Sequence, residues 1–371
     1  MRQFEIDHTS YTDIIDSLCQ RAYSEHVTTT DDIDLDEARL DAWIGGRLPG
    51  EGKPLSAVRM GEGTGIANAL FTISRGDHAW ILRRPPAVKN DPSASNIGRE
   101  WRILSALNGT TVPHPAALLH CDDPSVLGAP FLIMEVVAGF TPGFELPEPF
   151  TSDSRLRREL GMAYVDGIAE LSLVDWRARG LEGLGKPEGF LERQVPRWLA
   201  QLDRYRTRDL AELDFLVDWL ESNRPAMSPP ALLHGDYSPF NVMVAPAPPA
   251  RLAAIVDWDT GTIGDPLLDL GHLLARWTEP GEEPIITLQA GGSDGYPTRS
   301  EMADRYGQRT GRDLSALPYY QALALFKLAV ILEGRHAREV SLGVAEHDTS
   351  MATMVPALLR GAAGFATGRR V

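Results

Sequence analysis

Leu233–Val244 reads LHGDYSPFNVMV: an apolar run stops at a histidine, a glycine and a carboxylate, and it resumes after an asparagine. A second apolar run, AAIV at residues 253–256, stops at another carboxylate, Asp257. Both runs have the composition of short buried strands. Polar side chains at the ends of neighbouring strands are held in place by the strands behind them. We therefore expect Asp236, Asn241 and Asp257 to form one functional site.

These three residue types suit the transfer of a phosphoryl group. That reaction needs metal ions on the phosphates, a carboxylate that orients the attacking hydroxyl, and donors that hold the phosphates. Asp236, just after a strand, is placed to accept the proton of an acceptor hydroxyl. Asn241 and Asp257 offer an amide and a carboxylate oxygen, the hard ligands that Mg²⁺ prefers. We predict a catalytic base at Asp236 and metal ligands at Asn241 and Asp257.

A metallophosphatase is a second interpretation of the same stretch. His234 would then belong to a cluster of metal ligands with Asp236, Asp257, Asp265, Asp269 and His272. However, no Asp-x-His precedes the motif, and Tyr-Ser-Pro-Phe-Asn stands where that class has another acid or histidine. We instead expect His234 to bond to backbone near Asp257, Asp269 to brace the loop, and His272 to face the core.

The composition is that of an ordinary globular protein. With 371 residues, 43% hydrophobic and 23% charged, the chain is long enough for two domains. A net charge of −15 argues against the basic surface that nucleic-acid binding requires. The start, MRQFEIDHTS, has no apolar core behind a basic cap, so we expect no secretory signal there. The longest apolar run, YYQALALFKLAVIL, is too short to span a membrane and is broken by Lys327. Cys19 and Cys121 lack metal-ligand spacing and fit a reducing compartment. We predict a cytoplasmic protein without nucleic-acid or membrane partners; the oligomeric state stays open.

Apolar periodicity divides the chain into a β-rich part and a helical part. Residues 1–33 are weakly patterned and form an extension. Residues 34–137 contain a helix that Asp34 can cap, three β-like runs, a helical segment and two further strands. Residues 138–371 are dominated by long helices, with one hairpin through PAPPA at residues 246–250. We predict an α+β fold with two lobes, a β-rich N-lobe and a mainly helical C-lobe, and a cleft between them.

The paired stretches LLHGDYSPFNVMV and AIVDWDTGTIGDPLLDLG closely resemble the aminoglycoside phosphotransferase-like kinases, which are relatives of the protein kinases. The loop H-G-D-x-x-x-x-N of that family stands here as His234, Gly235, Asp236 and Asn241, and the metal-binding aspartate falls on Asp257. The resemblance implies a protein-kinase-like fold, ATP and Mg²⁺ as cofactors, and a small-molecule hydroxyl as acceptor. It extends over nearly the whole chain beyond the extension.

The same resemblance implies the nucleotide-binding residues. GEGTGIANALF at residues 61–71 resembles the nucleotide loop, with Gly63, Gly65 and Asn68 as its binding residues; by themselves these glycines also fit a hairpin turn. Arg83 in WILRR stands where most kinases have a lysine, and Glu100 in GREWRIL matches the glutamate that pairs with it. A strand-end surface charge is the alternative for Arg83. The connector falls on MEVV, residues 134–137, where Glu135 and Val137 would hold adenine through their backbone.

The acceptor is inferred from one branch of the family. GREWRILSAL, PFLIMEVVAGF and ALFKLAVILEGRHAR are similar to the kinase domains joined to acyl-CoA dehydrogenases, which implies a hydroxyacyl-CoA-type acceptor. Arg335, His336 and Arg338 in EGRHAR could meet an anionic group, or could simply be an exposed helix end. The alternatives are a kinase for aminoglycosides or other antibiotics, which the acidic composition would suit, and a non-catalytic nucleotide-binding pseudokinase.

Overall fold

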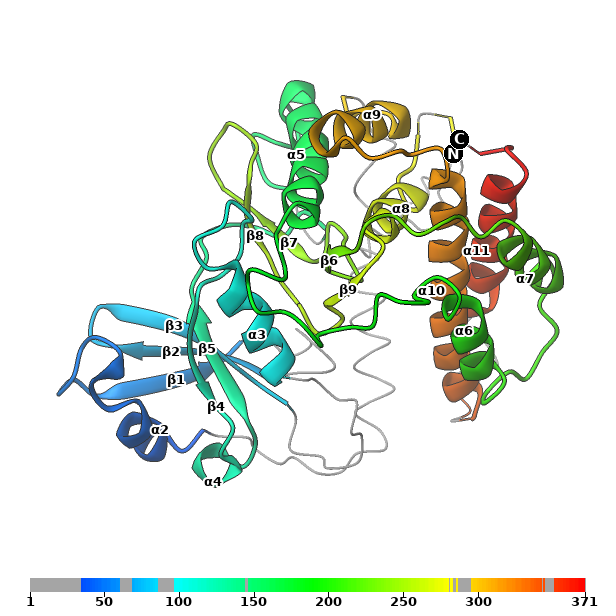
Figure 1. The fold of residues 1–371 in the computed structure, drawn as a ribbon. Coiled ribbons are helices and arrows are strands. Elements are labelled where there is room, and N and C mark those ends of the chain that lie inside the picture. The colour runs from blue at the N-terminus through cyan, green and yellow to red at the C-terminus, as the bar shows by residue number, and fades with distance from the viewer. Residues whose placement is uncertain are drawn as a thin grey trace, which may run out of the picture. The chain divides into compact units, whose positions relative to one another are not determined.

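A computed structural model describes most of the chain in two compact units (Figure 1). The described residues are 35–60, 69–85, 97–143, 146–279, 281–282, 285, 295–341, 343 and 350–370. The first unit takes the described residues up to Gly98 together with Ala117–Val136, and the second takes Arg99–Ala116 together with Val137–Val371. The predicted extension, residues 1–33, lies outside the described residues.

The first unit is built on an antiparallel sheet of five strands in the order β1-β2-β3-β5-β4. Its strands are β1 (Leu55–Arg59), β2 (Ala69–Arg75), β3 (His78–Arg84), β4 (Ala117–Cys121) and β5 (Phe131–Glu135). Its helical elements are α2 (Glu37–Ile44), the 3₁₀ turn η1 (Gly45–Arg47) and α4 (Pro124–Leu127). Along β2 the burial alternates, as expected of a strand with one face on the core. Leu40 and Ile44 of α2 belong to that core together with Phe71 and Ile133 of the sheet.

Helix α2 begins later than the sequence predicts. Its N-cap is Asp36, whose carboxylate accepts a 2.9 Å hydrogen bond from the backbone N–H of Arg39. Asp34, the predicted cap, lies outside the described residues. Glu37, in the first turn of α2, accepts a 2.8 Å bond from the backbone N–H of Ala57 on β1. The acidic run therefore provides both the cap of α2 and its link to the sheet.

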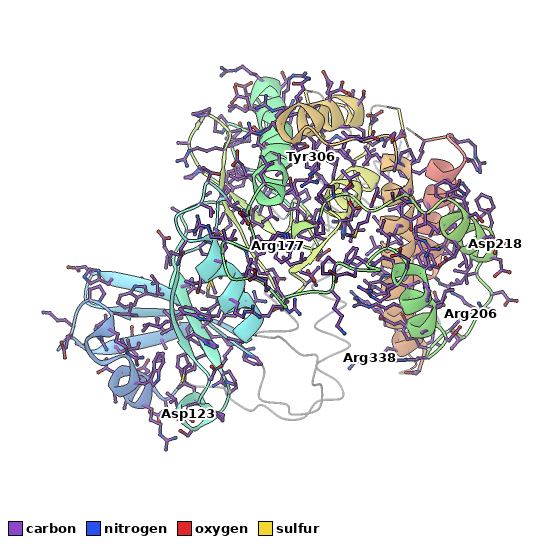
Figure 2. The ribbon with its side chains drawn as sticks, viewed as in Figure 1. Asp123, Arg177, Arg206, Asp218, Tyr306 and Arg338 are labelled. Atoms are coloured by element: carbon purple, nitrogen blue, oxygen red, sulfur yellow. The ribbon has the colours of Figure 1, made fainter. Side chains whose placement is uncertain are left out.

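The second unit is mainly helical. Its helices are α3 (Ile97–Leu107, from Arg99), α5 (Ser154–Ser172), α6 (Gln194–Leu202), α7 (Leu213–Ser222), α8 (Leu267–Ala275), α9 (Arg299–Thr310), α10 (Leu317–Ser341) and α11 (Ser350–Ala366). Helix α10 packs against α8 and α11, and α9 packs against α5. Charged side chains remain on its outer surface, among them Asp218 on α7 and Arg206 after α6 (Figure 2).

Two short strand pairs carry the motif. Strand β7 (Val242–Val244) pairs with β8 (Leu252–Ile255) through the proline-rich hairpin that the sequence predicts. Strand β6 (Ala231–Leu233) pairs with β9 (Thr262–Gly264). The sequence did not predict β9, because a strand of three residues containing glycine lacks a readable periodicity. The two pairs bring the segment before Asp236 and the segment after Asp257 together, since Leu233 lies opposite Thr262.

Helix α3 is bound to the second unit by its polar face. The Arg99 guanidinium donates to the carbonyls of Leu184 at 2.8 Å and Gly261 at 2.6 Å. Arg102 donates to the carbonyl of Glu182 at 3.1 Å. The division of the chain consequently places most of α3 in the second unit, whereas the sequence analysis placed all of it within residues 34–137.

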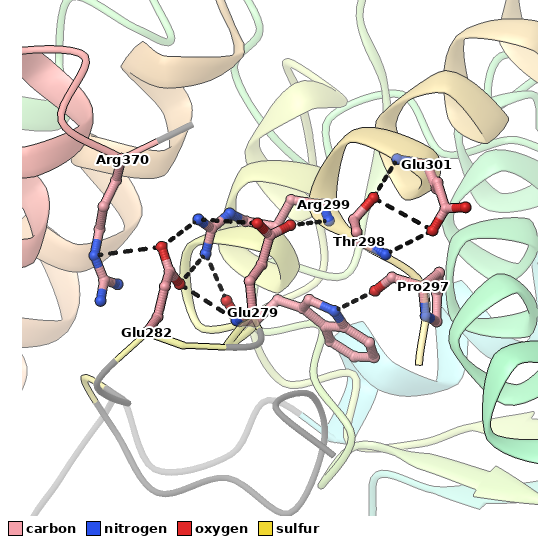
Figure 3. Close-up of polar contacts among 8 residues, drawn as sticks. Glu279, Glu282, Pro297, Thr298, Arg299, Glu301 and Arg370 are labelled. Carbon is pink, nitrogen blue, oxygen red and sulfur yellow. Dashed lines mark hydrogen bonds and ion pairs between the residues drawn. The ribbon is translucent and has the colours of Figure 1, made fainter. Parts of the chain in front are cut away.

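A network of charges links the segment after α8, the start of α9 and the segment after α11 (Figure 3). Arg299, only 3% exposed, makes a two-pronged contact with Glu282 at 2.7 and 2.6 Å and donates to the carbonyl of Trp277 at 2.8 Å. Its backbone N–H donates to Glu279 at 2.6 Å, and Arg370 approaches Glu282 at 4.0 Å. Such forked pairing holds the arginine in one orientation.

The predicted α+β class is confirmed: an antiparallel sheet forms the core of one unit and helices dominate the other. Among the residues that the structure describes, no helix is both long enough and apolar enough to cross a membrane.

Candidate functional site

The loop after β6 depends on a glycine in a left-handed conformation. Gly235 has φ +84°, and a Cβ there would lie 2.7 Å from the carbonyl oxygen of Thr260. Any other residue would be strained in its backbone and would also collide with that carbonyl. The backbone N–H groups of His234 and Gly235 both donate to the carboxylate of Asp269, at 2.7 and 2.8 Å. Asp269 therefore braces the loop, as the sequence analysis expected.

Asp269 is buried, and burial raises its pKa, while His234, its bonds from the two backbone N–H groups and Lys327 act in the opposite direction. Hydrogen bonds and positive neighbours favour the charged form of a carboxylate and offset part of the loss of water, but the pKa of Asp269 stays above its ordinary value. Asp269 thus belongs to the support of the loop.

His234 has a structural position. Its Nε2 lies 2.9 Å from the carbonyl oxygen of Val256, and its Nδ1 accepts a 3.3 Å bond from the backbone N–H of Asp236. These two bonds require a proton on Nε2 and none on Nδ1, which fixes the neutral tautomer. The ring also packs 4.8 Å from the ring of Trp258. His234 therefore bonds to backbone next to Asp257, as expected.

The metallophosphatase interpretation finds no support in this geometry. Asp265 accepts from the backbone N–H groups of Ser228 and Leu267 and from the hydroxyl of Tyr320, so its oxygens serve the packing of α8 and α10. Within the described ranges, no group of three or more histidine, cysteine, aspartate or glutamate side chains is arranged to hold a metal ion.

Asp236 and Asn241 are in direct contact. The Asn241 Nδ2 donates to the Asp236 backbone carbonyl at 2.8 Å and to its Oδ2 at 3.2 Å. The Asp236 side chain is 49% exposed, so its carboxylate is held from one side and open to solvent on another. A carboxylate that is oriented and still accessible can accept a proton from a bound molecule.

The backbone beside Asp257 is hydrogen-bonded to Asn241. The backbone N–H of Val256 donates to the Asn241 carbonyl at 2.9 Å, which places Asp257 one residue from a point bonded to Asn241. Asp257 has φ +65°, one of two non-glycine residues with positive φ in the described part of the chain. Such strained backbone is common at functional sites.

The donor set fits a magnesium ion. With its Nδ2 engaged by Asp236, the side-chain oxygen of Asn241 remains as a ligand, and Asp257 adds a carboxylate. Mg²⁺ takes oxygen ligands and is commonly held by one or two protein oxygens together with nucleotide phosphates and water.

Three basic side chains that the sequence analysis did not assign to the site surround Asp236. His272 on α8 is 4% exposed, and its Nε2 lies 3.4 Å from Asp236 Oδ1. Burial, with Arg276 and Lys327 nearby, holds the pKa of His272 well below its ordinary value, so the ring is neutral and the contact is not an ion pair. The Arg276 guanidinium donates to the Tyr237 carbonyl at 3.3 Å.

Lys327 on α10 is the third of these groups. Its Nζ donates to the carbonyl of Gly235 at 2.7 Å. Burial lowers the pKa of Lys327, while the carboxylates of Asp236 and Asp269 favour its charged form. The one signal in the sequence was a lysine inside the apolar run YYQALALFKLAVIL. The run does not show that Lys327 contacts Gly235, because that contact forms only when α10 packs against the distant loop.

The proposed nucleotide residues are described in part. Arg83 on β3 lies opposite Leu70 and Leu132 and is 8% exposed, so the interpretation of Arg83 as a surface charge is wrong. Glu100 on α3 is 1% exposed. Glu135 ends β5 opposite Trp80, and Val137 lies two residues further along the chain. Gly63, Gly65 and Asn68 lie outside the described residues. The pairing of Arg83 with Glu100 stays a prediction.

Comparison with known proteins places the chain in one family. The model of the phosphotransferase enzyme family matches residues 62–303. Acyl-CoA dehydrogenase family member 11 of Rattus norvegicus is 31% identical over 312 residues, which cover 82% of this chain and 40% of that protein. Member 10 of Mus musculus is 29% identical over 286 residues, or 75% of this chain and 26% of that protein. The chain therefore spans less than half the length of these relatives.

Solved structures agree on the fold. A Ralstonia eutropha protein described as a candidate aminoglycoside phosphotransferase is 28% identical, with a TM-score of 0.76 over 90% of this chain and 99% of that one. A thermostable mutant of aminoglycoside phosphotransferase APH(4)-Ia, in complex with AMP-PNP and hygromycin B, has a TM-score of 0.57 at 15% identity over 88% of this chain and 98% of that one, a likeness of fold alone. The resemblance seen in the two paired motifs is thus confirmed, and the chain belongs to the phosphotransferase enzyme family.

Proposed function

We propose that the protein transfers the γ-phosphoryl group of ATP to a hydroxyl of a small molecule, with Mg²⁺ as cofactor. The observation that carries this proposal is the contact of a half-exposed Asp236 with Asn241, whose backbone carbonyl is bonded one residue before Asp257. This contact places an oriented base beside two oxygen ligands that are connected through the same hydrogen bonds. In this proposal Asp236 is the catalytic residue, and Asn241 and Asp257 are the metal ligands.

The chemistry then follows from the positions of the side chains. Bound Mg²⁺ would neutralise charge on the phosphate oxygens. Asp236 orients the acceptor hydroxyl, whose oxygen forms the new bond to the γ-phosphorus as the bond to the β–γ bridging oxygen breaks and ADP leaves. The hydroxyl proton passes to Asp236 and from its exposed side to water. On the nucleotide side we assign Gly63, Gly65, Asn68, Arg83, Glu100, Glu135 and Val137.

Mg-ATP should stabilise the folded protein, and Asp257→Asn should remove most of that effect. A ligand present at a hundred times its Kd adds about 2.7 kcal/mol to the free energy of unfolding. Asparagine is the informative substitution, because it tolerates the positive φ of Asp257 while it removes the charge. The measurement is the shift in melting temperature against ATP concentration, with Mg²⁺ and with EDTA.

Lys53→Met, a change in an exposed lysine of the first unit, is the matched control and should behave like wild type. A folded wild-type protein that shows no shift at millimolar Mg-ATP contradicts nucleotide binding. An equal magnesium-dependent shift in Asp257→Asn would leave binding in place but remove Asp257 from the metal site. Binding without turnover of any acceptor would favour the pseudokinase alternative.

For the acceptor, we propose a hydroxyacyl-CoA-type molecule in preference to an aminoglycoside. The relatives named above are acyl-CoA dehydrogenase family members. A concavity of about 570 Å³ in the second unit is lined by Lys186, Arg193 and Arg197, with Glu192 as its one acid. Thr262 also lines it and lies opposite Leu233, at the start of the catalytic loop. This excess of positive charge suits an anionic acceptor and opposes a polycationic one.

The EGRHAR segment gives less support than the sequence analysis suggested. Arg335 is paired with Glu339 at 2.7 Å within α10, and His336 is buried. Arg338 is the exposed member of the segment (Figure 2). The proposal of an anionic acceptor therefore rests on the positively charged residues of the concavity beside Thr262, and no longer on EGRHAR.

Hydroxyacyl-CoA compounds should be phosphorylated with a higher kcat/KM than aminoglycosides, and Lys186→Gln/Arg197→Gln should raise the KM for them. The double variant should leave the KM for ATP unchanged, because its residues lie on the acceptor side. The measurement is ADP release across a panel of hydroxyacyl-CoA compounds, aminoglycosides and small alcohols, at two salt concentrations. Arg206→Gln, an exposed arginine outside the concavity, is the control. Turnover of aminoglycosides alone would reverse the assignment.

A further inference from the structure

The carbonyl of Gly235 is the point at which the catalytic loop meets α10. Gly235 has no Cβ to limit its torsion angles, so its left-handed φ depends on the contacts that hold its peptide groups. Its N–H is held by Asp269 on α8, and its carbonyl by Lys327 on α10. The next N–H, that of Asp236, is held more loosely by His234 Nδ1 at 3.3 Å. The bond from Lys327 therefore restrains the peptide that leads directly into Asp236.

Lys327 is placed for this contact at an energetic cost. Its neighbours along α10, Phe326 and Leu325, are buried and apolar, and its Nζ lies 5.7 Å from the centre of the Trp198 ring. Removing an ammonium group from water is unfavourable unless charge and hydrogen bonds compensate. The compensation comes from the Gly235 carbonyl and from the nearby carboxylates of Asp236 and Asp269. A hydrophobic residue would fill this place in α10 without that cost, so packing alone does not account for a lysine.

We propose that Lys327 is a positioning residue for Asp236, which fixes the Gly235–Asp236 peptide and thereby the direction of the Asp236 carboxylate. The assignment of Asp236 as the base rests on the proposed function. Lys327 itself does not touch the reacting atoms. Together with Asp269 it holds Gly235 between two opposite charges, a carboxylate on the N–H and an ammonium on the carbonyl.

The first test reads the peptide itself and does not need an acceptor. Labelling glycine carbonyls with ¹³C and aspartate nitrogens with ¹⁵N selects the Gly–Asp peptides, which occur in the sequence at Gly76, Gly235 and Gly264. Asp236→Asn identifies the Gly235 signal by removing it. In Lys327→Met the Gly235 carbonyl resonance should move while the other two stay in place. In Arg206→Gln, the exposed control used above, all three should stay in place.

The second test reads catalysis. Lys327→Met should lower kcat roughly 10²-fold, the scale expected when a catalytic group is misplaced by about 1 Å, with the KM for ATP unchanged. Lys327→Arg, which keeps the charge, should recover most of the rate. If Lys327→Met fails to fold, Lys327→Gln takes its place in both tests.

The two readouts separate this proposal from the proposed function. An unmoved Gly235 resonance in a folded variant overturns the positioning role whatever the activity. So does a moved resonance with an unchanged kcat. A moved resonance in a protein whose wild type phosphorylates no acceptor leaves the Lys327 contact with the loop established, and counts against the proposed function instead.

Discussion

Asp236→Asn should lower the rate of single-turnover phosphoryl transfer by roughly two to four orders of magnitude, the usual contribution of a positioned acid–base group. The loss stays within that range because the hydroxyl gives up its proton late in a loose transition state. Asparagine keeps the shape of aspartate and can still accept the bond from Asn241 Nδ2, so the loop should stay in place. The measurement is product formation in one turnover with Mg-ATP saturating.

ATP affinity in this variant should remain close to that of wild type, because the proposed function places Asp236 on the acceptor side. Asp218→Asn, the same chemical change at an exposed site on α7, is the control and should transfer at the wild-type rate (Figure 2). A near-normal rate in Asp236→Asn would mean that the carboxylate only braces the loop.

Arg208→Met should lower the free energy of unfolding by about 3–5 kcal/mol, the cost of leaving a buried charge without its partner. Arg208 contacts Glu333 on α10 through two nitrogens at 2.6 to 3.1 Å and donates to the carbonyl of Ala352 on α11 at 3.0 Å. Glu333 is fully buried, at 0% exposure, whereas Arg208 is partly exposed. Removing the arginine therefore leaves the more deeply buried charge, that of Glu333, without its partner.

The double variant Arg208→Met/Glu333→Leu tests the cause. If the unpaired Glu333 carboxylate causes the loss of stability, replacing it with leucine should recover most of that loss, since apolar replacements of buried ion pairs are often neutral. Urea unfolding of wild type, both single variants and the double variant gives the coupling energy. Equal losses in Arg208→Met and in the double variant would show that the damage comes from lost packing or from the orphaned Ala352 carbonyl.

The features that could be predicted from the sequence are those set by residues close to one another in the chain. The proximity of Asn241 to Asp236 and to the residue before Asp257 could be predicted, because strand ends and fixed spacings can be read along the chain. The large helices were found from their periodicity. The cap of α2 was missed by two residues, because several aspartates in a row can each act as a cap.

The basic groups around Asp236 were missed for a different reason. His272 and Lys327 reach the loop from α8 and α10, and each sits in a sequence that reads as a buried apolar helix. The contact with Asp236 or its neighbour exists only once both helices have packed. Arg99 and Arg102 on α3 are a similar case, since an exposed polar face and a face bound to distant carbonyls have the same pattern.

Helix α3 bears on the order in which the chain can fold. The chain enters the second unit at Arg99, returns to the first at Ala117 and leaves it again after Val136. During synthesis Arg99 emerges long before Leu184 and Gly261, whose carbonyls it binds. Domains usually fold as units in the order of their synthesis, the N-terminal one first. Here the sheet can be completed once Val136 is made, while Arg99 cannot make all of its bonds until Leu184 and Gly261 have been made. A ribosome-bound chain ending before Gly261 should therefore present part of α3 to solvent and to chaperones.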